Sequence, residues 1–232
     1  LDLLTGVILA TLARVTGERR QVIGFPFMRR MGSGAVNALA PGVNVLPLRV
    51  DVDEDAAVVD TARAVREALK HARRHQRYDA EWIQRDLGLV GTGRALYGPI
   101  VNVRLFDDGL DFAGVPGITH HLATGPVDDF EFGVRVQGGT VLIDLRADRT
   151  RYTVDDLIRQ GQRLARVVEQ TIAAPATPVH ALSVMGRDED AAISRWSAGP
   201  VFEAPSRPAD IIDVFTRQVQ ETPEATALVF GP

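Results

Sequence analysis

Helical and strand-like hydrophobic patterns alternate along the first part of the chain. A helical spacing runs through Leu1, Leu4, Ile8, Leu12 and Val15. Gly17 follows and is typical of a helix end. Residues 21–27 and 43–52 are then rich in strand-forming residues, and the first run is expected to end at Pro26. The second run has apolar residues on both faces, as an interior strand has. This order predicts a helix packed on a sheet.

Three further helices are predicted from spacing and capping residues. Asp53-Glu54-Asp55 places carboxylates at the start of a helix, where they favour the positive end of its dipole. The inner stripe of that helix is Val58, Ala62, Val65 and Leu69. Asp79 can cap a short helix that Gly88 closes. Thr153 and Asp156 resemble a capping box and predict the start of a long helix.

Strands are predicted between the last two of these helices. Residues 100–106 are predicted to form a strand, and residues 130–136 alternate apolar and polar side chains. Gly138-Gly139 supplies a tight turn after which residues 141–145 return. This pattern indicates a β-hairpin.

The pattern changes after residue 172. From Ala173 to Pro208 prolines are frequent and no period is sustained, which is typical of a linker. Residues 211–219 then predict a short helix, and residues 225–230 predict a strand. The chain opens without Met inside a helical pattern and stops after an apolar run, so we expect it to be a piece of a larger polypeptide.

Charge and cysteine content limit the function classes. Lys and Arg number 26 against 30 Asp and Glu, which gives a net charge of −4 and argues against nucleic acid or an anionic membrane as partner. The chain has no cysteine, so it can form neither disulfides nor thiolate metal sites. No apolar run is long enough to span a membrane, and no signal peptide is recognisable. We expect a cytoplasmic protein.

A basic, histidine-rich segment ends the second predicted helix. Its cations are Lys70, Arg73, Arg74 and Arg77. His71 and His75 are four residues apart, a spacing that can bind zinc, but Ala72 stands where the metalloprotease motif has glutamate. The surrounding cations would also repel a metal ion, so no metal site is predicted. The segment either complements the dipole at a helix end or binds an acidic or phosphorylated partner.

Two asparagines stand in otherwise apolar strands. Asn44 and Asn102 each need hydrogen-bond partners if they are buried. Each is therefore either a structural hydrogen-bond hub or a group that lines a cavity, and the second alternative is weaker for Asn102.

Four segments in order resemble one known family. They are residues 24–49, 73–81 (RRHQRYDAE), 97–103 (YGPIVNV) and 122–129 (LATGPVDD). The chain is similar, over roughly residues 1–172, to the C-terminal half of condensation domains of nonribosomal peptide synthetases, in the form found in aryl-capped siderophore synthetases. The second segment matches the His-Gln motif of this family with His75, Gln76, Asp79 and Glu81. For Asp79 and Glu81, a cap and a first-turn carboxylate are the favoured roles.

The resemblance implies an α/β fold, the two-layer sandwich of chloramphenicol acetyltransferase. Residues 1–172 would be the C-terminal lobe of a condensation domain, residues 173–208 a linker, and residues 209–232 the start of an adenylation domain. In this family two lobes form a V with a tunnel between them, and two carrier-bound thioesters enter from opposite faces.

The resemblance also assigns candidate site residues. The catalytic motif of the family is two histidines, three residues and Asp-Gly, and it lies in the N-terminal lobe. His120-His121 is not followed by that aspartate, so no catalytic residue is expected in the chain and the motif is expected upstream of Leu1. A loop role is favoured for the pair, with lining of the substrate tunnel as the alternative, and Asn44 is a second candidate for tunnel lining. Carrier docking is assigned to Arg73, Arg74 and Arg77.

The implied reaction joins a carrier-bound aryl acyl thioester to a carrier-bound aminoacyl thioester through an amide bond, in siderophore biosynthesis. Its partners would be the N-terminal lobe, the downstream adenylation domain, and donor and acceptor carriers that contain phosphopantetheine. ATP and Mg²⁺ would serve only the adenylation domain, and the fragment alone is expected to be inactive.

Two alternatives to this function remain. The chain could belong to a non-catalytic condensation-like scaffold that recruits enzymes or carriers. It could also belong to a stand-alone acyltransferase that uses coenzyme A, although the linker and the adenylation-like start argue against that.

Overall fold

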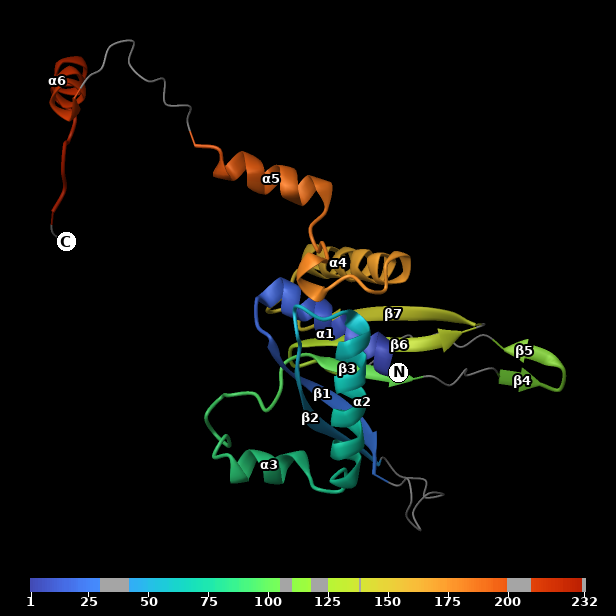
Figure 1. Ribbon diagram of the computed structural model, residues 1–232. Helices are drawn as coiled ribbons and strands as arrows, with labels where there is room; N and C mark the ends of the chain where they lie inside the picture. Colours follow the sequence, from blue (N-terminus) through green and yellow to red (C-terminus); the bar gives the residue numbers. More distant parts are fainter. Residues whose placement is uncertain (30–41, 105–109, 118–124, 138, 200–209, 231–232) are drawn as a thin grey trace. The chain divides into compact units, whose positions relative to one another are not determined.

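The computed structural model describes residues 1–29, 42–104, 110–117, 125–137, 139–199 and 210–230. It divides into two compact units, residues 1–186 and residues 187–232. The first unit contains a five-stranded sheet in the order β2-β1-β3-β6-β7. Figure 1 shows these strands: β1 (Arg20–Met28), β2 (Val43–Asp51), β3 (Ile100–Arg104), β6 (Phe130–Gln137) and β7 (Thr140–Ala147).

The sheet is mixed. β1 pairs with β2 and β6 pairs with β7 in antiparallel fashion, whereas β3 runs parallel to both β1 and β6. The hairpin expected from the alternation on either side of Gly139 is therefore confirmed as β6 and β7. A separate small hairpin joins β4 (Leu110–Phe112) to β5 (Val115–Gly117).

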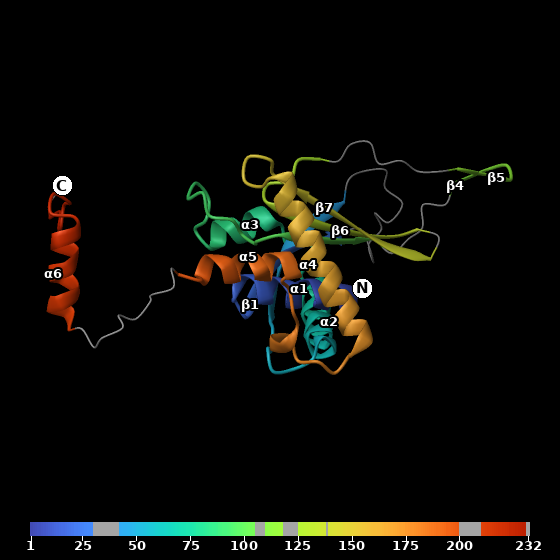
Figure 2. The ribbon, with the colours of Figure 1, turned by 90° about the horizontal axis from the view of Figure 1, so that it is seen from above.

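The main core lies between the sheet and three of the described helices: α1 (Asp2–Thr16), α2 (Val58–Arg74) and α4 (Val154–Ala173). Figure 2 shows these helices from above. α1 is the most enclosed, since Ile8 and Leu9 have no exposed surface. The stripe expected on α2 is buried, with Val65 fully covered and Leu69 2% exposed. The predicted packing of helices on a sheet is confirmed.

The ends of α1 and α4 agree with the predictions, and the start of α2 differs. Gly17 ends α1 in the left-handed conformation with φ of 72°, and Thr153 and Asp156 form the expected capping box at the start of α4. The expectation that Asp53-Glu54-Asp55 opens α2 is wrong. The helix begins at Val58, so these carboxylates lie in the preceding turn, and Asp60 is the acid in its first turn.

The first strand does not end at Pro26 as expected, but continues to Met28. The register and the hydrogen bond from Arg29 N to Gly42 O place the odd-numbered residues of β1 in hydrogen bonds to β2. The ring nitrogen of Pro26 therefore faces the other side, where the described pairing with β3 is at Gly24. The proline interrupts no described ladder hydrogen bond and is tolerated for that reason.

The second strand is not interior as expected, because β2 forms one edge of the described sheet. Its even-numbered residues bond to β1, as the hydrogen bond from Val52 N to Arg19 O shows. The backbone groups of Val45, Pro47 and Arg49 therefore point away from the sheet. Pro47 has no N–H to expose at this edge. Proline at such a position disfavours the pairing of an edge strand with other chains, because it offers no hydrogen-bond donor.

Part of the segment after α4 is packed in the first unit. Val179 and Leu182 are fully buried in the first unit, and a short 3-10 helix, η1 (Val179–Ala181), forms there. The second unit contains α5 (Arg187–Ser197) and α6 (Ile211–Glu221). α6 confirms the helix expected at residues 211–219, whereas the strand expected at residues 225–230 is wrong, because those residues form no strand in the described structure. The division into lobe, linker and adenylation start stays a prediction.

Candidate functional site

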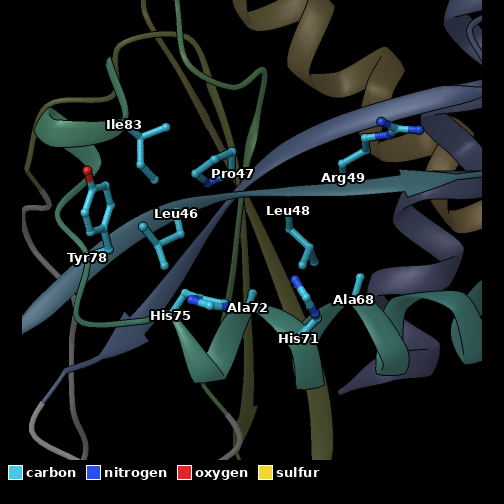
Figure 3. Close-up of a pocket in the computed structure, with 10 residues that line it drawn as sticks. All are labelled: Leu46, Pro47, Leu48, Arg49, Ala68, His71, Ala72, His75, Tyr78 and Ile83. Carbon is cyan, nitrogen blue, oxygen red and sulfur yellow. The ribbon is translucent and has the colours of Figure 1, made fainter. Parts of the chain in front are cut away.

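A groove of about 550 Å³ lies between the edge strand β2 and the C-terminal half of α2. Its floor is apolar, with Leu46 and Leu48 only 4% and 2% exposed, and Ala68 and Ala72 form the helix side. Figure 3 shows the lining residues and places Tyr78 and Ile83 at one end of the groove. Ile83 belongs to the short helix α3 (Ala80–Asp86). The groove thus adjoins the His-Gln motif.

The histidine pair of α2 lines this groove. His71 and His75 are one turn apart, and their ring centroids are 5.4 Å apart. Both side chains lie on the groove side of the helix (Figure 3). They bring polar ring nitrogens to the margin of an otherwise apolar floor. The absence of a metal at this pair stays a prediction.

Asn44 connects β2 to the motif. It is 6% exposed, and its Nδ2 donates to the carbonyl oxygens of Gln76 at 3.1 Å and Tyr78 at 2.8 Å. Its Oδ1 accepts from the Ala80 N–H at 3.4 Å. Of the two alternatives for Asn44, the structure shows the hydrogen-bond hub, and tunnel lining by Asn44 stays a prediction.

A second anchor fixes the motif from the end of β1. Arg29 forms a 2.6 Å ion pair with Asp79 and donates a 3.1 Å hydrogen bond to the Arg77 carbonyl oxygen. The expectation that the Asp79 side chain caps α3 is wrong: Asp79 occupies the N-cap position, but its side chain makes no capping hydrogen bond. Its carboxylate is in the ion pair with Arg29 instead. Glu81 lies exposed in the first turn of α3, as expected.

The basic residues surround the end of α2. Arg73 and Arg74 are exposed in its last turn, where positive charge complements the helix dipole. Lys70 forms a 3.6 Å pair with Glu67, and Arg77 follows in the loop that Arg29 and Asn44 hold. Carrier docking by Arg73, Arg74 and Arg77 stays a prediction.

The other predicted site residues lie elsewhere. His120 and His121 fall outside the described residues. Asn102 Nδ2 donates to Glu131 at 3.3 Å, and Arg146 forms a 2.6 Å ion pair with the same carboxylate. The favoured structural role of Asn102 agrees with this network across β3, β6 and β7.

Sequence reasoning missed three residues of the groove region. Tyr78 donates from its hydroxyl to Asp86 at 2.6 Å, and this bond raises the pKa of the phenol. Arg49, a residue of β2, lines the groove and pairs with Asp51 at 3.1 Å. Arg29 anchors the motif loop. Their partners are distant in the sequence or not periodic, so no local pattern identifies them.

Comparison with known proteins places these observations in a family. The model of the condensation domain family matches residues 1–194, so the chain belongs to that family. It has the chloramphenicol-acetyltransferase-like fold of these domains, as the resemblance implied.

The relatives include siderophore synthetases. The chain is 37% identical over 229 residues to vanchrobactin synthetase VabF of Vibrio anguillarum, covering 99% of this chain and 8% of that protein. It is 36% identical over 228 residues to enterobactin synthase component F of Escherichia coli K12, covering 98% of this chain and 17% of that protein. The chain thus spans only a small part of these synthetases.

Solved condensation domains have the same fold. The starter condensation domain of rhizomide synthetase RzmA matches with a TM-score of 0.68 and 29% identity, covering 80% of this chain and 45% of that chain. The first condensation domain of the calcium-dependent antibiotic synthetase, in complex with a substrate analogue, matches with a TM-score of 0.71 and 28% identity, covering 80% and 41%. The chain therefore spans less than half of each solved chain.

Among the described residues, no helix is long and apolar enough to cross a membrane.

Proposed function

We propose that this chain is the C-terminal lobe of a condensation domain that forms an amide bond between an aryl acyl thioester and an aminoacyl thioester, both on carriers, in siderophore synthesis. The observation that supports this most directly is the family match over residues 1–194. The order of the motifs and the 41–45% coverage of solved condensation chains support an assignment to one of the two lobes. The siderophore relatives support the aryl donor.

The role of this lobe follows from what its residues can and cannot do. Acyl transfer to an amine needs a group that positions or accepts the amine proton and donors that stabilise the oxyanion. In the proposed function the family's histidine motif supplies the first of these from the N-terminal lobe. This lobe supplies one wall of the tunnel and, at the basic end of α2, a surface for a carrier with its phosphopantetheine arm. The synthetase is proposed to act in the cytoplasm.

The test is amide formation by the intact synthetase and by the 232-residue chain. The intact protein, given a carrier-bound 2,3-dihydroxybenzoyl or salicyl thioester and an aminoacyl carrier, should form the amide and free the thiol of the donor carrier. The product stays on the acceptor carrier as a thioester and is detected by mass spectrometry of that carrier. The chain alone should form none above the uncatalysed rate, because the catalytic histidine lies outside it. If the intact protein binds carriers but forms no amide with aryl or alkyl donors, it is a scaffold and the proposal is wrong. Turnover by the isolated chain would refute its assignment as a non-catalytic lobe.

A further inference from the structure

A second groove, of about 350 Å³, lies between the edge strand β7 and α4. Ile143 and Leu145 of β7 line one side of it, and Gly161, Ala165 and Val168 belong to the helix side. Figures 1 and 2 show α4 next to β7. The groove thus lies at the margin of the sheet, where a further strand beside β7 would place its side chains next to α4.

The outer edge of β7 presents backbone groups that bond to no strand of the described sheet. The hydrogen bond from Asp148 N to Asp129 O places the even-numbered residues of β7 in bonds to β6. The N–H and C=O groups of Val141, Ile143 and Leu145 therefore point away from β6. None of these residues is proline, so this edge can pair with another strand, in contrast to the β2 edge.

An apolar stripe runs along one side of α4. Its members repeat at alternating intervals of four and three residues, which keeps them on one side of a helix. They are Val154, Ile158, Gly161, Ala165, Val168 and Ile172. Val154 and Ile172 are 74% and 75% exposed, and Ile158 is 52% exposed. The described part of the chain therefore leaves much of this stripe uncovered, although such side chains are usually buried.

The stripe is complementary to itself. If two copies of α4 run antiparallel about position 163, the opposed pairs are Val154–Ile172, Ile158–Val168 and Gly161–Ala165. Large residues then meet large residues towards both ends of the contact. The small pair meets at the centre, where it lets the two helices approach closely. A two-fold axis produces this arrangement, because both copies then use the same patch.

One two-fold axis fits the helix stripe and the strand edge together. A Cβ added to Gly161 would lie 3.3 Å from the Leu145 side chain, so the centre of the stripe lies over Leu145. If two β7 strands pair antiparallel about Leu145, Asp144 of one copy lies opposite Arg146 of the other. Opposite charges in cross-strand pairs stabilise a sheet, whereas like charges destabilise it. Strand and helix therefore favour the same axis.

We propose that two copies of the chain associate through β7 and α4, so that their sheets join into one and their α4 helices pack antiparallel. The contact between the helices is about 27 Å long, from a rise of about 1.5 Å per residue between positions 154 and 172. Helix layer and strand edge together are about 20 Å deep. The flat footprint is then about 500 Å², less than the roughly 800 Å² per partner of a standard interface. The association should therefore be weak, with a Kd in the micromolar range.

The test measures the oligomeric state of the intact synthetase by sedimentation velocity, at concentrations that span the micromolar range. The unaltered protein should shift from monomer to dimer as its concentration rises. Val154→Lys and Ile172→Glu each place a charge on the stripe, and each should weaken the association about tenfold or more, because the charge would be buried in the dimer. Both positions are largely exposed in one copy, so the variants should fold, and circular dichroism and the melting temperature verify this.

The double variant Val154→Lys/Ile172→Glu tests the antiparallel arrangement. The two introduced charges have opposite signs and face each other at both ends of the contact. The double variant should therefore associate more tightly than either single variant. The matched control is Arg63→Glu on α2, where the side chain is 71% exposed, and this variant should associate as the unaltered protein does.

A cross-link locates the contact independently. The chain has no cysteine, so a cysteine introduced into the 232-residue chain reports a single position. Gln162→Cys lies beside the centre of the stripe, and a short bismaleimide should join two copies through it. Arg63→Cys should give no covalent dimer under the same conditions.

The outcomes separate this proposal from the proposed function, on which it does not depend. If the synthetase stays monomeric at every concentration, or forms a dimer that neither single variant weakens, the proposal is overturned and amide formation can still stand. Weakening by both single variants without recovery in the double variant would also overturn it, because the two copies would not meet antiparallel. If the association behaves as expected but no amide forms, the dimer stands and the condensation assignment fails.

Discussion

Replacing Asn44 should release the loop that contains the His-Gln motif. Its amide uses both N–H groups on the Gln76 and Tyr78 carbonyl oxygens and accepts the Ala80 N–H. Asn44→Ala removes all three hydrogen bonds and leaves a small cavity at a position that is 6% exposed. Asn44→Asp keeps the shape, but it places a carboxylate against two carbonyl oxygens.

The magnitude follows from these contacts. A typical hydrogen bond contributes about 0.5–1.5 kcal/mol net, and two of the three bonds have short distances of 3.1 and 2.8 Å. Water can reach the motif loop and replace part of the loss, so we expect Asn44→Ala to lower the free energy of unfolding by about 2 kcal/mol. Asn44→Asp should cost more at neutral pH, about 3–4 kcal/mol, because a buried carboxylate then faces two carbonyl oxygens and keeps only the long bond from the Ala80 N–H.

The two variants should also differ in pH dependence. Burial and the facing carbonyl groups should raise the pKa of the introduced Asp above its unfolded value of about 3.9. The penalty is therefore absent below about pH 4, where the carboxyl is protonated in both states, and it grows as the pH rises towards the folded pKa. Asn44→Ala should show no such dependence.

Two measurements check this prediction. Chemical denaturation of the chain, followed by Trp82 fluorescence in a Trp196→Phe background, gives the free energy of unfolding at pH 3 to 8. Hydrogen exchange gives the local effect, which should be faster exchange in residues 76–87 than in α1. Unchanged exchange in that segment, or equal stability of Asn44→Ala and Asn44→Asp at pH 7, would refute the role of Asn44 as the hydrogen-bond hub of the loop.

Two further predictions concern the packing around Gly24 and the capping of α4. In Gly24→Ala the added carbon would lie 2.6 Å from Cε2 of Tyr97, so we expect the free energy of unfolding to fall by about 1–3 kcal/mol. The control is Gly125→Ala, where the added carbon has open space, and it should change the free energy of unfolding by less than about 0.5 kcal/mol. Equal melting temperatures would contradict this. Thr153→Ala removes the hydroxyl that donates to Asp156, which is the first of the hydrogen bonds that lower the pKa of this carboxyl from 3.8 to about 2; the N–H of residue 153 and Arg159 still donate to it. The stabilisation from this bond is present above pH 4 and is lost towards pH 2, so the difference in melting temperature should shrink there to the part due to the capping bond from the Asp156 N–H to the hydroxyl; a constant difference would contradict this.

The elements predicted correctly are those that depend on interactions between residues close together in the sequence. The stripe of α2 has helical spacing, and the capping box of Thr153 and Asp156 lies within four residues of sequence. The β6–β7 hairpin needs only alternation and a turn at Gly139. In each case the interacting groups are close in the sequence, so a pattern in one segment suffices.

The errors concern groups whose partners are distant. The edge position of β2 depends on which strand lies beyond it, and apolar residues on both faces of the strand do not specify that. The burial of Val179 and Leu182 depends on contacts within the first unit, so the local proline-rich pattern does not predict it. Asp79 had the right residue type for a cap, but an arginine 50 positions earlier in the chain forms the ion pair instead.

The His-Gln motif shows why a motif can be recognised without its chemistry being understood. Gln76 and Tyr78 contribute backbone carbonyl groups to Asn44, and these contacts require a loop of fixed shape more than they require particular side chains. His75 differs from these two residues, because its side chain lines the groove and its backbone forms the C-cap of α2. The same short segment therefore contacts β2 through Asn44, leads into α3 and forms one end of the groove. A substitution of the His75 side chain should alter the lining of the groove, whereas a substitution of Asn44 should alter the conformation of the loop itself.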